Sequence, residues 1–147
     1  MQPKEIIYFG APGMGMELHF SLDSDDTDKK VSLFKCVIHA GARMPVPHYH
    51  ESFDETVYGL KGTVTYTIDG KEVKLGPGDC AFVPRGVVHS FQNRTDETIE
   101  FLAFISPGIF GSQYFKDLAA VVNAGGPPDL NMMKTVMLNH GLVPVLN

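Results

Sequence analysis

Residues 48–55 read HYHESFDE and place two histidines beside several carboxylates in one short segment. His48 and His50 are two residues apart, so on a β-strand both side chains point to the same face. Imidazole and carboxylate groups together suit divalent first-row metals, and three histidines with one carboxylate can leave positions open for water or substrate. The segment therefore predicts most of a metal site that a ligand from elsewhere in the chain would complete.

The elements that must position these residues have β-type patterns as far as residue 105. Residues 17–22 alternate apolar and polar side chains, and residues 31–39 are apolar at most positions, which is typical of a strand covered on both faces. Residues 63–75 are the clearest hairpin, with an Asp-Gly pair at the turn, and the acidic residues 23–30 are expected to form a solvated hairpin tip. Many short antiparallel strands predict a sandwich or barrel.

The pattern changes after Pro107. Apolar residues of segment 112–126 fall at helical spacing, with Gly125 expected to end the helix, and a second helix is expected to begin with Asp129 as its N-cap and to end before Gly141. About forty residues are too few to hold a core alone, so we expect these helices to pack on the barrel. The expected organisation is a single domain of residues 1–147, with a barrel at about 17–105 and a helical segment at about 110–141.

Two blocks of the sequence closely match the paired signature of the cupin superfamily. The first block has Gly41, His48-x-His50, Glu55 and Gly62, and the second has Gly78, Pro84-x-Gly86, His89 and Asn93. The blocks occur in the family's order, separated by residues 63–77. The chain thus resembles a small single-domain cupin. The resemblance implies an all-β cupin barrel, also called a double-stranded β-helix or jelly roll, with short C-terminal helices.

The resemblance also implies a ligand set and a type of chemistry. It implies one divalent transition metal ion, which could be Fe, Mn, Ni, Cu or Zn. The implied ligands are His48, His50, Glu55 and His89. Glu51 and Asp54 are competing carboxylates, but counting back from Gly62 favours Glu55. The chain looks like quercetin dioxygenase-type cupins, in which a metal binds substrate and dioxygen and oxidative ring cleavage follows. Glu55 would then also be the catalytic base toward a substrate hydroxyl.

The residues around this site are expected to be apolar and aromatic. The expected substrate pocket consists of Val57, Tyr66, Phe82, Phe91 and Phe101. Such a pocket suits a planar or lipophilic small molecule. One hypothesis is therefore a metal-dependent dioxygenase-type oxidoreductase. The alternative is a non-catalytic small-molecule-binding cupin whose metal is structural or anchors the ligand, because cupins host both kinds of function.

Composition limits the other partners. The formal net charge of −5 argues against general attraction to nucleic acid or to anionic membranes. The start of the chain lacks the basic segment followed by an apolar one that is typical of a secretory signal. The two cysteines, Cys36 and Cys80, are expected to be core residues, which fits a reducing compartment. We therefore expect a cytoplasmic protein. The apolar first strand would be an exposed sheet edge in a lone barrel, so we also expect a homodimer.

Overall fold

The computed structural model describes residues 2–42 and 46–145. The strands are β1 (Glu5–Phe9), β2 (Met16–Leu22), β3 (Ser32–Ile38), β4 (His48–His50), β5 (Asp54–Lys61), β6 (Val64–Ile68), β7 (Lys71–Leu75), β8 (Cys80–Val83), β9 (His89–Gln92), β10 (Ile99–Ser106) and β11 (Leu142–Pro144). The helices are the short 3-10 helix η1 (Ser24–Thr27), α1 (Ser112–Val122) and α2 (Leu130–Asn139).

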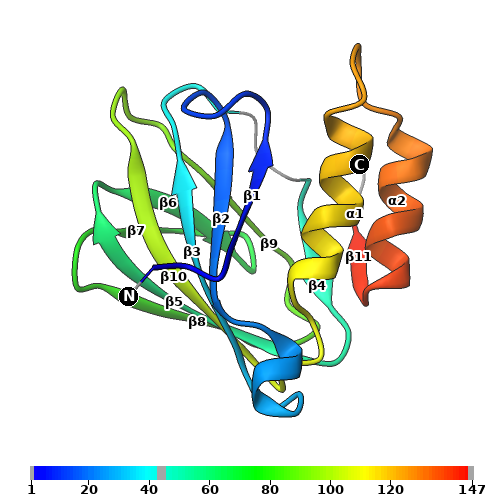
Figure 1. The fold of residues 1–147 in the computed structure, drawn as a ribbon. Helices are drawn as coiled ribbons and strands as arrows, with labels where there is room; N and C mark the ends of the chain where they lie inside the picture. The colour runs from blue at the N-terminus through cyan, green and yellow to red at the C-terminus, as the bar shows by residue number, and fades with distance from the viewer. Residues whose placement is uncertain (1, 43–45, 146–147) are drawn as a thin grey trace.

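The strands form two antiparallel sheets that curve around a common core (Figure 1). One sheet has the order β1-β2-β3-β10-β5-β8, and the other has the order β11-β4-β9-β6-β7. Helix α1 packs against β1 and α2, and α2 packs against β11, so the helices lie together at one side of the sheets. The predicted mostly-β architecture with short C-terminal helices is confirmed. None of the helices in the described part of the chain is long and apolar enough to cross a membrane.

Alternation along the strands separates the core from the outer faces. On β2, Leu18 and Phe20 are each 1% exposed and point inward, whereas Glu17 and His19 lie on the other face. On β10 the buried residues are Ile99, Phe101, Ala103 and Ile105. Burying one such leucine or phenylalanine side chain contributes about 1.5–3 kcal/mol. The period of two read from residues 17–22 is therefore the period of the core as far as Phe20; the register then shifts, and Leu22 is 38% exposed.

The hairpin predicted over residues 63–75 is confirmed as β6 and β7. Val64 pairs with Leu75 and Ile68 pairs with Lys71, which leaves a two-residue turn. Asp69 and Gly70 in that turn have φ angles of 52° and 77°. Positive φ at both central residues is the type I′ geometry that matches the twist of paired strands, and it explains why an Asp-Gly pair stands there.

Both C-terminal helices begin near the predicted residues. The Asp129 carboxylate accepts hydrogen bonds from the backbone N–H groups of Asn131 and Met132 at 3.0 and 3.1 Å, which confirms it as the N-cap of α2. Helix α1 ends at Val122, before the predicted Gly125, because Asn123 leaves the helix to bond the first strand. Its amide donates to the Tyr8 carbonyl at 2.8 Å and accepts from the Gly10 N–H at 2.9 Å.

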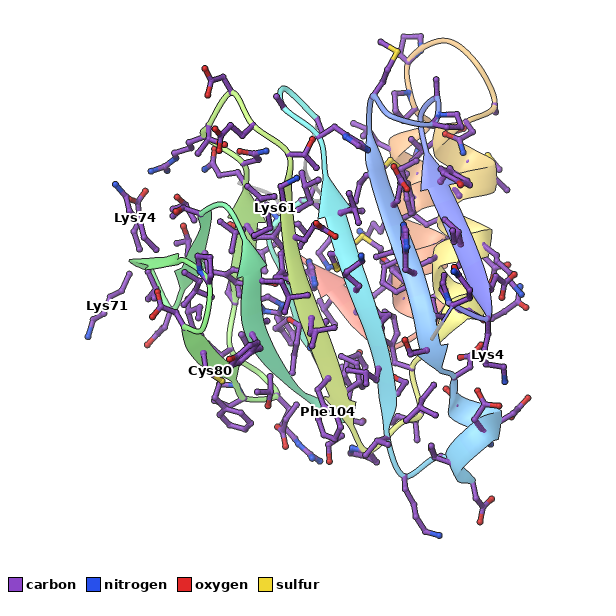
Figure 2. All side chains as sticks on the ribbon, turned by 60° about the vertical axis from the view of Figure 1, so that its left-hand side comes forward. Lys4, Lys61, Lys71, Lys74, Cys80 and Phe104 are labelled. Atoms are coloured by element: carbon purple, nitrogen blue, oxygen red, sulfur yellow. The ribbon has the colours of Figure 1, made fainter. Side chains whose placement is uncertain are left out.

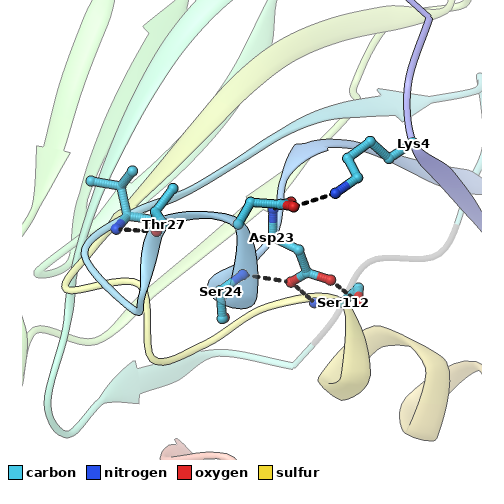
Figure 3. Close-up of polar contacts among 7 residues, drawn as sticks. Lys4, Asp23, Ser24, Thr27 and Ser112 are labelled. Carbon is cyan, nitrogen blue, oxygen red and sulfur yellow. Dashed lines mark hydrogen bonds and ion pairs between the residues drawn. The ribbon is translucent and has the colours of Figure 1, made fainter.

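The start of α1 is tied to the acidic segment after β2 (Figure 3). The Asp23 carboxylate accepts hydrogen bonds from the Ser112 N–H at 3.0 Å and from the Ser112 hydroxyl, and it also caps η1 through the Ser24 N–H at 2.9 Å. A Cβ at Gly111 would lie 2.2 Å from an oxygen of Asp23, so only glycine allows this approach. Residues 23–30 connect the paired strands β2 and β3 and none of them is buried, which confirms the predicted hairpin tip; Asp23 additionally joins this tip to the start of α1.

Asp23→Asn should destabilise the protein through this junction. Burial alone would raise the pKa of Asp23, but the hydrogen bonds from Ser112 outweigh it and hold that pKa below its ordinary value. An amide loses the charge and one acceptor, so we expect a loss of about 1.5–3 kcal/mol in the free energy of unfolding, measured by urea denaturation. Asp25→Asn, at an exposed position of η1, is the control and should change it by less than about 0.5 kcal/mol. Equal effects would contradict the assignment.

The outer face of the six-stranded sheet corrects two predictions. Phe82 pairs with Thr56 and Cys80 pairs with Tyr58, which places both on the face opposite to the core. Phe82 is 56% exposed, so its assignment to the substrate pocket is wrong. Cys80 is also exposed, so of the two cysteines only Cys36 is a core residue. Figure 2 shows Cys80 on this sheet together with Phe104, which is 38% exposed.

The homodimer stays a prediction. Strand β1 lies at the edge of the six-stranded sheet, as the sequence suggested, and an edge strand offers unpaired backbone groups to another chain. Light scattering at micromolar concentration should give twice the 16.1 kDa of one chain. A mass of 16.1 kDa that holds across a concentration series would contradict the prediction.

Candidate metal centre

Three histidines converge inside the barrel from two neighbouring strands. His48 and His50 lie on β4, and His89 begins β9, where it pairs directly with His48. All three histidines are buried. One ring nitrogen from each lies within 4.8 Å of the ring nitrogens of the other two. The His-x-His spacing thus works as predicted, because both side chains of β4 point to the same face.

Backbone carbonyls fix the orientation of two of these rings. The Nδ1 atom of His48 lies 2.9 Å from the Val46 carbonyl oxygen, and that of His89 lies 3.0 Å from the Val87 carbonyl oxygen. A carbonyl only accepts, so in each ring Nδ1 carries the proton and Nε2 keeps a free lone pair for a metal. In each case the carbonyl belongs to the residue two positions before the histidine.

His50 is held differently from the other two. Its ring stacks on Phe53 with centroids 4.3 Å apart, and its Nδ1 is buried and has no hydrogen-bond partner in the part of the chain that the structure describes. A buried ring nitrogen without a partner is costly, and a bound cation at the other nitrogen or a ligand would offset part of that cost. This unpartnered atom is consistent with a site built to bind something.

Burial keeps the three rings neutral at pH 7. Desolvation lowers the pKa of His50 to about 2, with the neighbouring His89 and His48 adding to the effect. Desolvation also lowers the pKa of His89 to about 4 and brings that of His48 below its ordinary value. Neutral imidazole is the form that binds a metal, so protons do not compete for these sites near neutral pH.

Glu55 adds a carboxylate from β5. Its Oε2 lies 3.5 Å from Nε2 of His89, and its side chain is 12% exposed. Desolvation raises the pKa of this carboxyl to about 7. Glu55 is not part of the group of three histidines within 4.8 Å, so it approaches the centre from the His89 side. A divalent cation there would favour the charged carboxylate and reverse the effect of burial.

The competing carboxylates point elsewhere. The Asp54 carboxylate accepts hydrogen bonds from the Arg85 side chain at 3.2 and 3.1 Å, outside the barrel, and Glu51 is exposed. Alternation along β5 explains this result, since Asp54 and Glu55 must face opposite sides of the sheet. Of the three carboxylates, only Glu55 faces the histidines. Nitrogen and oxygen donors of this kind fit a divalent first-row metal.

The site opens into a small cavity of about 50 Å³. Besides the four polar side chains, the cavity is lined by Met16, Leu18, Phe34, Cys36, Tyr66, Phe91, Phe101, Phe110, Tyr114, Phe115, Leu118 and Leu142. Tyr66, Phe91 and Phe101 line this cavity, and their role as a substrate pocket stays a prediction. Val57 is fully buried on the Glu55 side of β5, but it packs in the core and does not line the cavity.

Two features of the cavity were not foreseen from the sequence. Tyr66 lines the cavity, and its buried hydroxyl has no hydrogen-bond partner among the described residues. Helix α1 closes one side with Tyr114, Phe115 and Leu118. The apolar spacing of α1 signalled that the helix packs on the barrel, but no local pattern indicated that it covers the histidines.

Comparison with known proteins supports this geometry. Residues 34–105, which include all four candidate ligands, match the family described as Cupin domain. Quercetin 2,3-dioxygenase of Bacillus subtilis (strain 168) is 40% identical over 73 residues, which are 50% of this chain and 21% of that protein. An oxalate-binding protein of Thermotoga maritima is 32% identical over 97 residues, which are 61% of this chain and 74% of that protein.

Solved structures agree with the sequence matches. The crystal structure of a protein described as a predicted oxalate decarboxylase from Thermotoga maritima has a TM-score of 0.61 and 28% sequence identity, and it covers 73% of this chain and 93% of that one. The two sheets described above are therefore the two halves of a jelly-roll barrel, as the paired motifs implied. The matching segment, the shared fold and the buried histidines together show that the chain belongs to the cupin family.

Proposed function

We propose that this cupin is a metal-dependent oxidoreductase of the dioxygenase type that acts on a small apolar or aromatic molecule. The observation that carries the proposal is a set of three neutral histidines and one carboxylate buried at the wall of an apolar, aromatic cavity. The ion would be held by His48, His50, Glu55 and His89. The similarity of this region to a quercetin dioxygenase supports the same chemistry, over a match that spans 21% of that protein.

The residues of this chain would have distinct tasks. A bound ion of Fe, Mn, Ni or Cu supplies a Lewis acid and a centre for chemistry with dioxygen. Glu55 would accept the proton of a substrate hydroxyl; its position at the cavity beside His89 supports this role. The Tyr66 hydroxyl would donate a hydrogen bond to a substrate oxygen; its lack of a partner among the described residues supports this role. The aromatic walls exclude water from the reacting groups.

A non-catalytic binding role is the second candidate, and the small size of the cavity favours it. A free volume of about 50 Å³ holds only a few water molecules, so a ligand of few atoms fits this cavity best. The relative named as an oxalate-binding protein supports this reading. Among the described residues that line the cavity there is no lysine or arginine, so recognition of an anion would depend on the metal.

Metal content is the first property to measure. Untagged protein should contain one equivalent of a divalent transition metal by mass spectrometry. The His89→Ala variant should retain less than about a tenth of that metal, because even the loss of a hydrogen bond that supports a ligand lowers metal affinity by about 10–100-fold. His19→Ala is the matched control, because His19 bonds Glu17 on the outer face of the sheet. Absence of metal from the wild-type protein, also after incubation with each candidate ion, would contradict the site.

Oxygen uptake separates the two functions. With a panel of phenolic and 1,3-diketone compounds, the metal-loaded protein should consume dioxygen, and Glu55→Gln should slow this by about 10²–10⁴-fold through the loss of the base. Glu51→Gln, at an exposed neighbour, should leave the rate unchanged. Full metal occupancy without uptake for any compound would favour the binding role.

Tyr66→Phe in the same assay tests the proposed hydrogen bond. Removing a buried hydroxyl without a partner should leave the melting temperature unchanged or raised. Turnover should nevertheless fall by about tenfold or more, as expected when one donor to a substrate oxygen is lost. Unchanged turnover would mean that the hydroxyl does not contact the substrate.

A further inference from the structure

A second, larger hollow lies outside the metal cavity. Its volume is about 490 Å³, and its lining includes Phe9, Met14, Val122, Leu130 and Met133. These residues come from the end of β1, from the segment after it and from both C-terminal helices. Met14 and Leu130 are 72% and 69% exposed, which are high values for large apolar side chains. The groove is thus an apolar surface open to solvent, of a size that is common for small-molecule sites.

Two side chains are shared between this groove and the metal cavity. Among the described residues, Met16, at the start of β2, and Leu118, in the middle of α1, line both hollows. Each is 6% exposed, so both are packed at the boundary between the groove and the cavity. Methionine is unbranched and adapts its shape readily, and a leucine side chain can change rotamer without moving its helix. The wall is therefore one that side-chain rotation can open.

The sizes of the two hollows explain why such an opening is needed. The metal cavity of about 50 Å³ has room for about three to five water molecules, whereas ligand sites commonly measure about 300–1,000 Å³. An aromatic or lipophilic molecule does not fit beside the histidines unless part of it extends elsewhere. The groove offers that volume directly behind Met16 and Leu118.

Lifting the whole helix is a costlier route. Helix α1 is tied at its start by the Asp23–Ser112 hydrogen bonds and after its end by the bonds of Asn123 to Tyr8 and Gly10. Separating the helix would break these bonds and expose Phe115, which packs against Phe20 and Phe34. Rotation of two apolar side chains breaks none of them. Entry past Met16 and Leu118 is therefore favoured over opening of the helix.

We infer that the groove binds the apolar body of a ligand whose oxygen-bearing head reaches the metal centre, with Met16 and Leu118 as the gate between the two. The inference rests on the proposed function, since it needs a metal with an open position for the head. The ligand class is a molecule with two adjacent oxygen donors at one end and an alkyl chain or ring system at the other. Long ligands then gain affinity from the groove, and short ones do not.

Hydroxamic acids of different chain length test this inference by calorimetry with the Ni²⁺-loaded protein. Acetohydroxamate offers the chelating head alone, and octanohydroxamate adds an alkyl tail that can gain up to about fourfold in affinity per buried methylene. We expect the long probe to bind the wild-type protein at least about tenfold more tightly than the short one. Met133→Trp, which fills the groove, should reduce this ratio to less than about threefold without weakening the short probe.

Met132→Trp is the matched control. Met132 is the adjacent residue of α2, is 54% exposed and lines a different surface. It should keep the wild-type ratio. If Met133→Trp fails to fold, as judged by its thermal melt, Val122→Trp fills the same groove from α1 and should give the same result.

The outcomes distinguish this inference from the proposed function. Equal affinity of both probes, or an unchanged affinity ratio in both groove variants, would contradict binding of the tail in the groove. Either result would still be compatible with a metal that has an open position. If neither probe binds the Ni²⁺-loaded wild-type protein, the metal has no free position. That result would contradict both the binding of a tail in the groove and the proposed function. A high ratio that only the groove variants lose would establish the groove as the site of the tail.

Discussion

Exclusion of water from three imidazoles and one carboxylate is the constraint on which the rest of this structure depends. Burial makes the charged form of each group costly, which lowers the pKa values of the histidines and raises that of Glu55. A cation placed among them would meet four donors that are largely shielded from bulk water. The barrel, its aromatic walls and the cover formed by α1 all maintain this shielding.

The barrel supplies this environment with few specialised features. The same arrangement, a ring nitrogen bonded to the carbonyl two residues earlier, orients His48 on β4 and His89 on β9. Direct pairing of these two residues across the strands then brings their free nitrogens together. The backbone, which is the most rigid part of a sheet, therefore sets the geometry of the donors, and the side chains around them mainly provide dryness and shape.

Local patterns in the sequence were enough for features that depend on neighbouring residues. The same-face placement of His48 and His50 follows from their spacing, and the turn of β6 and β7 follows from the conformations that Asp69 and Gly70 accept. The choice of Glu55 needed the family motif. Phe82 was misplaced because the face of β8 depends on its register with β5, where Phe82 pairs with Thr56 and not with Glu55. The cover of the cavity depends on contacts between residues 89 positions apart, such as Asp23 and Ser112, which no local pattern reveals.

The contact between Asp23 and Ser112 also has a consequence for how this fold can diversify. The segment shared with the family, residues 34–105, contains the four candidate ligands, whereas Met16, Asp23, Ser112 and Leu118 all lie outside it. The two flanks contact each other through Asp23 and Ser112, and they also pair with the shared segment, β2 with β3 and β11 with β4. Relatives that keep the donor set can therefore differ in the flanks, so that the choice of ligand can evolve while the donors stay the same.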